Sequence, residues 1–443
     1  MTPSSILNQL AIEGGQPSRA FPFATWPFFE SDEIEAAVSV LRSAKINYKT
    51  GEQGRLFEKE FATFSGCKYG VAVANGTVAL ELALHALGIG TGDEVVVPSR
   101  TFIASASCVV MRGAIPVVAD VDATSQNLTA DTIRPLLTAR TKAIIAVHLA
   151  GWPCEMDSIL ELARDRGIKV IEDCAQSHGA TYKGRPVGSL GDAAAFSFCQ
   201  DKIMTTGGEG GMLTTNDDSV WECAKSFRDH GTREAAAQKG HNSPGFRWVH
   251  DSFGTNWRLT EMQSAIGRVQ LRKLAHWTAI RRRNASLLTK GLSACTALRV
   301  TTPPKEIGHS YYKYYVFVRP ERLRTGQDRD RIMAAINAEG VPCFTGSCSE
   351  IYLEKAFSKE LRPQQRMTVA KKLGETSLMF LVHPTLSEQD MLDTCHAVEK
   401  VLDRTANRRP HLLCWSRGVN KQLADFNTQS KFESSIRHAV ADH

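Results

Sequence analysis

The 443-residue sequence lacks the features that mark several protein classes. No apolar run reaches about eighteen residues, the length that a membrane-spanning helix needs. The N-terminus has neither the basic region nor the apolar core of a signal peptide. The sequence also has no internal repeat and no low-complexity segment. We therefore expect a cytoplasmic protein with no membrane partner.

The eleven cysteines show no metal-binding pattern. Cys343 and Cys348 have four residues between them, but no second pair or histidine cluster completes a zinc set. Free thiols in a reducing compartment, and no metal site, are the expectation. The net charge is only +6, and the basic residues are scattered apart from 281–283 and 408–409. A concentrated basic face is missing, so we expect no nucleic-acid partner.

Short apolar runs do recur, and helical segments such as 77–87 and 156–165 separate them. Runs without polar alternation suit strands that are buried on both faces. Strand–helix alternation predicts an α/β fold, with a mostly parallel seven-stranded sheet wrapped by helices. The expected strands are residues 71–74, 94–97, 115–119, 143–147, 169–172, 194–198 and 211–215.

The pattern predicts four parts of the chain. Residues 1–25 form an N-terminal arm, and 26–270 form the large α/β domain, whose first helix, 31–41, has Ser31 and Asp32 as N-cap candidates. Residues 271–404 form a smaller C-terminal α+β domain, and a long helix over about 260–288 connects the two. This domain contains a strand at 314–318 and helices at 328–338 and 387–402. The tail, 405–443, has no clear periodicity and is left unassigned.

The most informative segment, 196–211, contains Lys202 between Ser197 and a glycine cluster. A lysine amine can form a Schiff base with an aldehyde, and a serine hydroxyl can hold a phosphate. Glycines let the backbone approach a flat ring closely. An aldehyde, a phosphate and a flat ring together describe pyridoxal phosphate (PLP). Taken by itself, the segment is explained equally well by a surface lysine on a loop.

Three other segments place suitable groups at strand ends. Gly76 and Thr77 open a helix, whose free amides form an anion site or a simple cap. Asp173 follows a strand and could meet a ring nitrogen, or could serve as a turn residue. Gln176 could donate to a phenolic oxygen of the ring. Phe102 could stack on the ring or pack in the core. Ligands of parallel sheets bind at this edge, so the coincidence favours a single cofactor site.

This ordered set resembles the fold-type-I PLP enzymes, and specifically the sugar aminotransferases of the DegT–StrS type. The resemblance covers roughly residues 10 to 402. The segments that carry it are 75–80, 92–98, 172–180, 196–211, 228–231 and 256–267.

The resemblance implies a role for each residue. Lys202 would carry the cofactor and move the proton, and Asp173 would face the pyridine nitrogen. Asn256 would reach the phosphate of the neighbouring subunit's cofactor, which implies a homodimer. The remaining implied cofactor contacts are Gln176 on the phenolic oxygen, Phe102 on the ring face, and Gly76, Thr77 and Ser197 on the phosphate.

The sequence departs from the family pattern in two places. Cys199 stands where the family commonly has histidine, and 348–352 replaces a common His-Tyr-x-Pro segment. These departures leave the acceptor sugar open. His309 and Lys313 fall where family members place sugar contacts, and Lys313 could meet a diphosphate or be a solvated strand lysine.

The resemblance implies transamination of a keto sugar, expected to be nucleotide-linked, with glutamate as amino donor and an amino sugar as product. A member that forms a cyclitol or an aminobenzoate is an alternative, as is a non-catalytic regulator that retains the fold. The sugar dehydratase branch has histidine in place of the lysine, so Lys202 argues against it.

Overall fold

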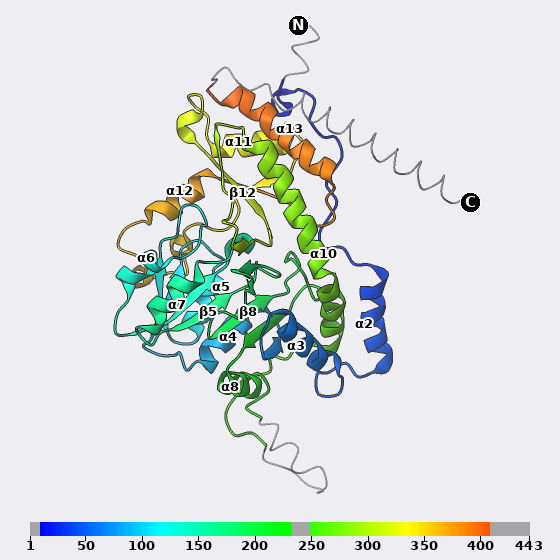
Figure 1. Cartoon of the computed structure of the whole chain (residues 1–443), viewed down its shortest axis with the longest axis vertical. Helices are drawn as coiled ribbons and strands as arrows, with labels where there is room; N and C mark the ends of the chain where they lie inside the picture. Colours follow the sequence, from blue (N-terminus) through cyan, green and yellow to red (C-terminus); the bar gives the residue numbers. More distant parts are fainter. Residues whose placement is uncertain (1–8, 233–248, 408–443) are drawn as a thin grey trace, which may run out of the picture.

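A computed structural model describes residues 9–232 and 249–407. The unassigned tail therefore lies outside the described residues, except for its first three positions. Two sheets define the architecture: a seven-stranded sheet in the lower part of Figure 1 and a four-stranded sheet in the upper part.

The large sheet confirms the predicted α/β class. Its seven strands coincide with the seven predicted runs to within two residues. In spatial order they are β1 (Tyr69–Val73), β9 (Gly211–Thr215), β8 (Ala193–Ser197), β5 (Lys169–Asp173), β4 (Thr141–Val147), β2 (Glu94–Pro98) and β3 (Ile115–Ala119). The pairs among β8, β5, β4, β2 and β3 are parallel, whereas β9 is antiparallel to both β1 and β8.

Alternate residues of the strands enter different cores, because successive side chains point to opposite faces. Val95 and Val97 of β2 belong to a core that includes α4 (Gly76–Ala86) and α5 (Ala104–Met111). Val96 belongs to a second core, which includes α7 (Met156–Arg164). Both faces are thus covered, which explains the lack of polar alternation. The remaining helices around the large sheet are α3 (Gln53–Phe64), α6 (Ala130–Ile133) and α8 (Asp218–Arg228).

The smaller sheet is antiparallel and runs β10 (Leu298–Val300), β12 (Tyr314–Val318), β14 (Ser377–Phe380) and β13 (Cys343–Phe344). Its helices are α11 (Arg329–Ala338), α12 (Thr368–Thr376) and α13 (Glu388–Thr405). A third, short sheet joins β11 (Ile307–Gly308), β6 (Thr181–Tyr182) and β7 (Arg185–Pro186).

A 32-residue helix, α10 (Glu261–Leu292), runs along the side of the molecule from the larger sheet to the smaller one (Figure 1). Thr260 caps it, because its hydroxyl accepts from the Gln263 amide in a capping box. Its first half packs on α3 and α2 (Ser31–Ser43), and its second half packs on α13. The predicted domain boundary at residue 270 falls inside this helix.

Helix α2 is tied to α10 by one ammonium group. Lys273 Nζ lies 2.6 to 2.8 Å from carboxylate oxygens of Glu30, Asp32 and Glu33. The N-cap of α2 is Glu30, one residue before the predicted candidates, because the Glu33 carboxylate reaches back to the Glu30 amide. Ser31 is therefore the first helical residue.

Residues 9–30 form an extended arm that runs beside α13 and then down to α2 (Figure 1). Arg19 anchors it through ion pairs with Asp390 and Asp393 of α13. The Glu339 carboxylate accepts the Ala11 and Ser18 amides. The arm is thus fixed against the smaller sheet's helices.

Two expectations concern the chain as a whole. Within the described ranges, no helix has the length and apolar character that crossing a bilayer requires. The cysteines of these ranges are all free thiols, as the spacing predicted. The cytoplasmic location and the division into domains stay predictions.

Candidate active site

A cavity of about 840 Å³ lies at the edge where the parallel strands end. Strands β5 and β8 end at Asp173 and Ser197, and β1 leads directly into α4. Segments around the smaller sheet complete the cavity wall with Tyr312, Tyr315 and residues 346–348. The cavity brings together eight predicted site residues: Gly76, Thr77, Phe102, Asp173, Gln176, Ser197, Lys202 and Lys313.

Asp173 is a buried carboxylate at the base of the cavity, 6 % exposed. Its Oδ2 accepts from the Ser105 hydroxyl at 2.9 Å and its Oδ1 from the Ala175 amide at 3.1 Å. Within the described ranges no salt bridge reaches it. Burial raises the pKa of the Asp173 carboxyl, against the lowering effects of these two donors and of the Lys202 charge. Such a carboxylate favours a cationic ligand atom beside it.

A second buried acid, Glu172, supports this strand end from the other face. The Glu172 carboxylate accepts from the amides of Gly188, Leu190 and Gly191 at 2.7 to 3.0 Å. His148 Nε2 lies 3.0 Å from it, while His148 Nδ1 accepts from an amide, so the ring donates through Nε2. The bonds to Glu172 lower its pKa against the opposing effect of burial.

Lys202 projects into the cavity from the loop after β8. Its Nζ lies 3.6 Å from Asp201 Oδ1 and 5.1 Å from the centre of the Tyr312 ring. The Tyr312 hydroxyl donates to the other oxygen of Asp201. Trp26 of the arm donates from its ring nitrogen to the Lys202 carbonyl at 2.8 Å. The adjacent Asp201 and the distant Tyr312 therefore lie beside the amine, while Trp26 of the arm fixes the backbone of Lys202.

An anion cradle lies at the start of α4. The first amides of a helix, here those of Gly76 and Thr77, have no intrahelical acceptor. A Cβ at Gly76 would lie 2.5 Å from Ser197 Cβ, so only glycine lets this helix start approach the serine closely. The Asn75 side chain caps the helix by accepting from the Val78 amide. The amides and the Ser197 hydroxyl thus converge at one point of the cavity wall.

Gln176 and Phe102 present opposite chemistries to the cavity. Gln176 Oε1 accepts from the Ala150 amide at 2.8 Å, which leaves its NH₂ group as the donor on the cavity side. Phe102 is 67 % exposed although it is aromatic, and it lines the cavity beside Thr101. An exposed ring at a cavity wall is available to stack on a flat ligand.

Two predicted residues do not line this cavity. Asn256 pairs its backbone with Asp229, next to the point where the Trp257 carbonyl accepts from Ala74 beyond β1. His309 is buried, stacks on Tyr311 with ring centres 3.8 Å apart, and accepts from the Tyr311 amide. Within a single chain, neither the Asn256 nor the His309 side chain therefore lines the cavity that the other eight predicted residues share.

Comparison with known proteins decides the family. Residues 28–399 match the model of the DegT/DnrJ/EryC1/StrS aminotransferase family. The chain belongs to this family. It is an enzyme of the aminotransferase type, as the sequence predicted.

Individual relatives agree with this assignment. The aminotransferase is 39% identical over 350 residues to GDP-perosamine synthase of Caulobacter vibrioides, covering 78% of this chain and 89% of that one. It is 36% identical to UDP-N-acetyl-3-dehydro-alpha-D-glucosamine 3-aminotransferase of Acidithiobacillus ferrooxidans, with coverages of 84% and 94%. The X-ray structure of the aminotransferase from Psychrobacter cryohalolentis matches with a TM-score of 0.85 and 52% identity, covering 86% and 99%.

Three residues of the aminotransferase site were not singled out from the sequence. Ser105 lies in the segment after β2, and its type carries no distinctive signal. Asp201 directly precedes Lys202, and this adjacency could have indicated it. Tyr312 falls between the two predicted substrate residues, but its hydroxyl meets Asp201 only because the tertiary fold brings together two residues that are 111 positions apart.

His178 packs among three phenylalanines behind the site, Phe61, Phe196 and Phe198, and its ring nitrogens have no partner in the described part of the chain. Burial lowers its pKa from 6.5 to about 3, and the charges of Lys202 and Arg281 act in the same direction. The folded-state pKa lies below the unfolded value. The neutral ring therefore contributes stability above pH 6.5, and this contribution is lost as the pH falls towards 3.

Replacing His178 with phenylalanine should therefore reduce the acid sensitivity of folding. At pH 5 the cost of keeping His178 neutral is about 2 kcal/mol, which the variant avoids. Urea unfolding at pH 7 and pH 5 measures this difference, and the exposed His276→Asn variant serves as the control. An unchanged pH dependence in His178→Phe would mean that the folded protein accepts a charged ring here.

Proposed function

We propose that the enzyme is a PLP-dependent aminotransferase that converts the ketone of a nucleotide-linked sugar into an amine, with glutamate as the amino donor. One observation carries the proposal: the Lys202 amine, the buried Asp173 carboxylate and the Gly76–Ser197 cradle face one cavity. Membership in the family and the names of the relatives support the sugar substrate.

The donor set fits PLP. The buried Asp173 carboxylate would pair with the pyridinium nitrogen, and the NH₂ group of Gln176 would donate to the phenolic oxygen. The cradle would take the phosphate at the helix N-terminus. Phe102 would cover the ring. PLP supplies an aldehyde that accepts the amino group and a ring that withdraws electrons.

The protein's own groups then carry the remaining work. Lys202 Nζ is the nucleophile that would attach to the aldehyde, and as a free amine it would accept and return a proton at the donor's α-carbon. Asp201 and Tyr312 keep this amine at the cavity wall whenever it is free. Asp173 would hold the ring proton in place at its carboxylate.

Substrate profiling tests the proposal. Purified holoenzyme is incubated with nucleotide keto sugars or keto cyclitols, each with glutamate or glutamine, and the products are identified by mass spectrometry. An amino sugar formed with glutamate is the expected product. Amination of cyclitols alone would favour the alternative member, and a colourless protein without turnover would favour the regulator.

The cradle gives a separate prediction. Gly76→Ala should weaken PLP affinity by about tenfold or more, because the added Cβ meets Ser197 and opens the cradle. Turnover at saturating PLP should fall much less, since the phosphate is bound equally in the ground and transition states. Gly90→Ala is the matched control, because Gly90, like Gly76, has no positive φ, while the nearest atom to its Cβ position lies at an ordinary contact distance of 3.7 Å. Equal PLP affinity in wild type and Gly76→Ala would refute the cradle.

The role proposed for Asn256 predicts a homodimer in which each active site contains residues of both chains. Lys202→Ala and Asn256→Ala chains, mixed under conditions of proven exchange, should regain activity at limiting PLP. A heterodimer would carry both lesions in one site and none in the other, if Asn256 acts across the interface. Activity no higher than that of Asn256→Ala alone, or a monomeric active enzyme, would disprove this assignment.

A further inference from the structure

The backbone carbonyl of Lys202 is held by a residue of the N-terminal arm. Lys202 lies in the irregular loop after β8, where its own amide donates to the Cys199 carbonyl at 3.1 Å. Within residues 9–232 and 249–407, no backbone amide donates to the Lys202 carbonyl. The donor is the indole nitrogen of Trp26, 2.8 Å away and 176 positions earlier in the sequence. Two hydrogen bonds therefore hold the two peptide groups on either side of the Lys202 Cα.

These two peptide groups determine where the lysine side chain points. Peptide units are rigid planes, so φ and ψ are the only soft backbone dihedrals of a residue. When both flanking planes are held, φ and ψ of Lys202 are held, and with them the direction of its Cα–Cβ bond. A rotation of the carbonyl would redirect the side chain at its root and move Nζ away from its place beside Asp201 and Tyr312. The Trp26 bond thus acts on the amine although it is made at the backbone.

Trp26 is itself held on several sides. Its indole meets Trp277 of α10 edge to face, with ring centres 5.1 Å apart, and stacks on His383, which follows β14, at 6.1 Å. The guanidinium of Arg281, also in α10, lies over the indole, with Cζ 5.2 Å from the ring centre. A cation is attracted to the face of an indole. These contacts fix the ring plane, and therefore the direction in which the N–H points.

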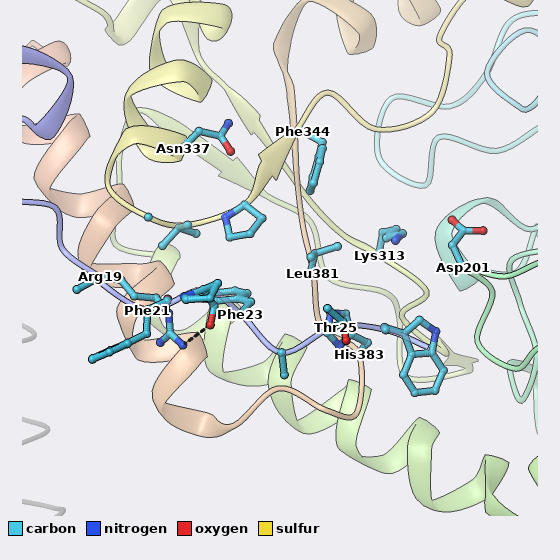
Figure 2. A pocket seen from close by; sticks show the side chains of 17 residues that line it. Arg19, Phe21, Phe23, Thr25, Asp201, Lys313, Asn337, Phe344, Leu381 and His383 are labelled. Atoms are coloured by element: carbon cyan, nitrogen blue, oxygen red, sulfur yellow. Dashed lines mark hydrogen bonds between the residues drawn. The ribbon is translucent and has the colours of Figure 1, made fainter. Parts of the chain in front are cut away.

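The arm brings Trp26 to this place from a distant anchor. Figure 2 shows the arm running from Arg19, towards one end of a cavity of about 680 Å³, past Thr25 to the end at which Asp201 lies. The Thr25 carbonyl, one residue before the indole, accepts from the Thr385 hydroxyl at 3.1 Å. The arm is thus attached at Arg19 and again directly beside Trp26.

We propose that Trp26 is a positioning residue for Lys202, so that the arm belongs to the machinery that transfers the amino group. This rests on the proposed function, in which the Lys202 amine attaches to the aldehyde of PLP and later moves a proton. Both steps need the amine at reacting distance from a carbon atom, and small displacements of a reacting group cost large factors in rate. Without the indole N–H the amine is aimed correctly for a smaller part of the time, and both steps slow together.

The attachment of PLP to the full-length protein freed of cofactor tests the proposal. After PLP is added, the rise of the visible absorbance gives the rate at which Lys202 attaches to it. Trp26→Phe should lower this rate, and the turnover at saturating substrates, by about tenfold, an effect in the range of one hydrogen bond. The affinity for pyridoxamine phosphate should not change, because this form of the cofactor has no aldehyde and uses only the other contacts. General damage to the cavity would weaken that affinity as well.

Two further variants separate the hydrogen bond from the packing of the ring. Benzothienylalanine at position 26 keeps the shape of the indole but has sulfur in place of the N–H, so it should be as slow as Trp26→Phe. Trp221→Phe is the matched control, because Trp221 also stacks on an aromatic ring, Tyr69, at 4.3 Å, but lines neither the cofactor cavity nor the cavity beside the arm. Amide hydrogen exchange should be faster at residues 199–206 in both position-26 variants and unchanged in the control.

Each contrary result overturns the role of Trp26. Attachment at the wild-type rate in Trp26→Phe, or unchanged hydrogen exchange at residues 199–206, would do so. Wild-type attachment in the benzothienylalanine variant would assign the effect to ring packing, and an equal loss of pyridoxamine phosphate affinity would make the role structural.

A failure of the proposed function looks different. Borohydride reduction and peptide mapping of the wild type would then find no PLP on Lys202. PLP on Lys202 together with unaltered rates in both variants would reject only the role of Trp26.

Discussion

Lys202→Ala should abolish turnover and remove the visible absorbance of the lysine-bound cofactor. The variant loses the amine that lines the same cavity as Asp173 and that is the proposed nucleophile. PLP itself should still bind, because the Gly76–Ser197 cradle is untouched. Absorbance spectroscopy, PLP titration and product formation by mass spectrometry measure the three effects separately.

The exposed Lys355→Ala variant is the control for Lys202→Ala, and it should behave as wild type. Transamination by Lys202→Ala at a rate near that of the wild type would remove Lys202 from the chemistry. Lys313 would then be the lysine to test next, since it lines the same cavity and its Nζ lies 4.7 Å from the centre of the Tyr312 ring.

Asp173→Asn should lower the turnover rate by several orders of magnitude while the protein stays folded. A neutral amide cannot hold the ring proton, so the ring withdraws electrons less strongly. The variant retains both local bonds, because an amide can accept from Ala175 and donate to Ser105. Burial already disfavours the charged form of Asp173, so folding should lose little when the charge is removed.

Rate and stability must be measured together for this variant. Single-turnover kinetics give the rate, urea unfolding gives the stability, and the exposed Asp165→Asn variant is the control. A loss of less than about tenfold, roughly 1.4 kcal/mol of barrier, would mean that Asp173 is not the partner of the ring nitrogen. A large loss of stability would mean that its role is structural.

Local patterns predicted the strands and the strand-end residues well, for a physical reason. A strand buried on both faces needs an uninterrupted apolar run, which a single sequence displays. Asp173 and Ser197 follow from this, because the carboxyl ends of parallel strands meet at one edge. The family model then confirmed the resemblance on which the enzyme class depended.

Contacts between distant segments escaped the sequence. Tyr312, which precedes β12 of the smaller sheet, contacts Asp201, which follows β8 of the larger sheet. Trp26 donates to the Lys202 carbonyl from the arm. The spacing of apolar residues along the sequence predicts neither of these two contacts. The predicted start of α2 at Ser31 is confirmed, but its N-cap is Glu30 and neither of the predicted candidates, since the Glu33 carboxylate reaches back to the Glu30 amide. The roles of Asn256 and His309 stay predictions.

Helix α10 also has a consequence for how the protein unfolds. Its first half contributes Leu274 to a core against the larger sheet, and its second half contributes Leu288 and Leu292 to the core against the smaller sheet. Unwinding one half of α10 exposes the apolar side chains of that half to water. It also removes the continuous helix that holds the two cores in a fixed relative orientation. We therefore expect the parts of the chain around the two main sheets to unfold as one cooperative unit, and a graft of either part between relatives to need α10 as well.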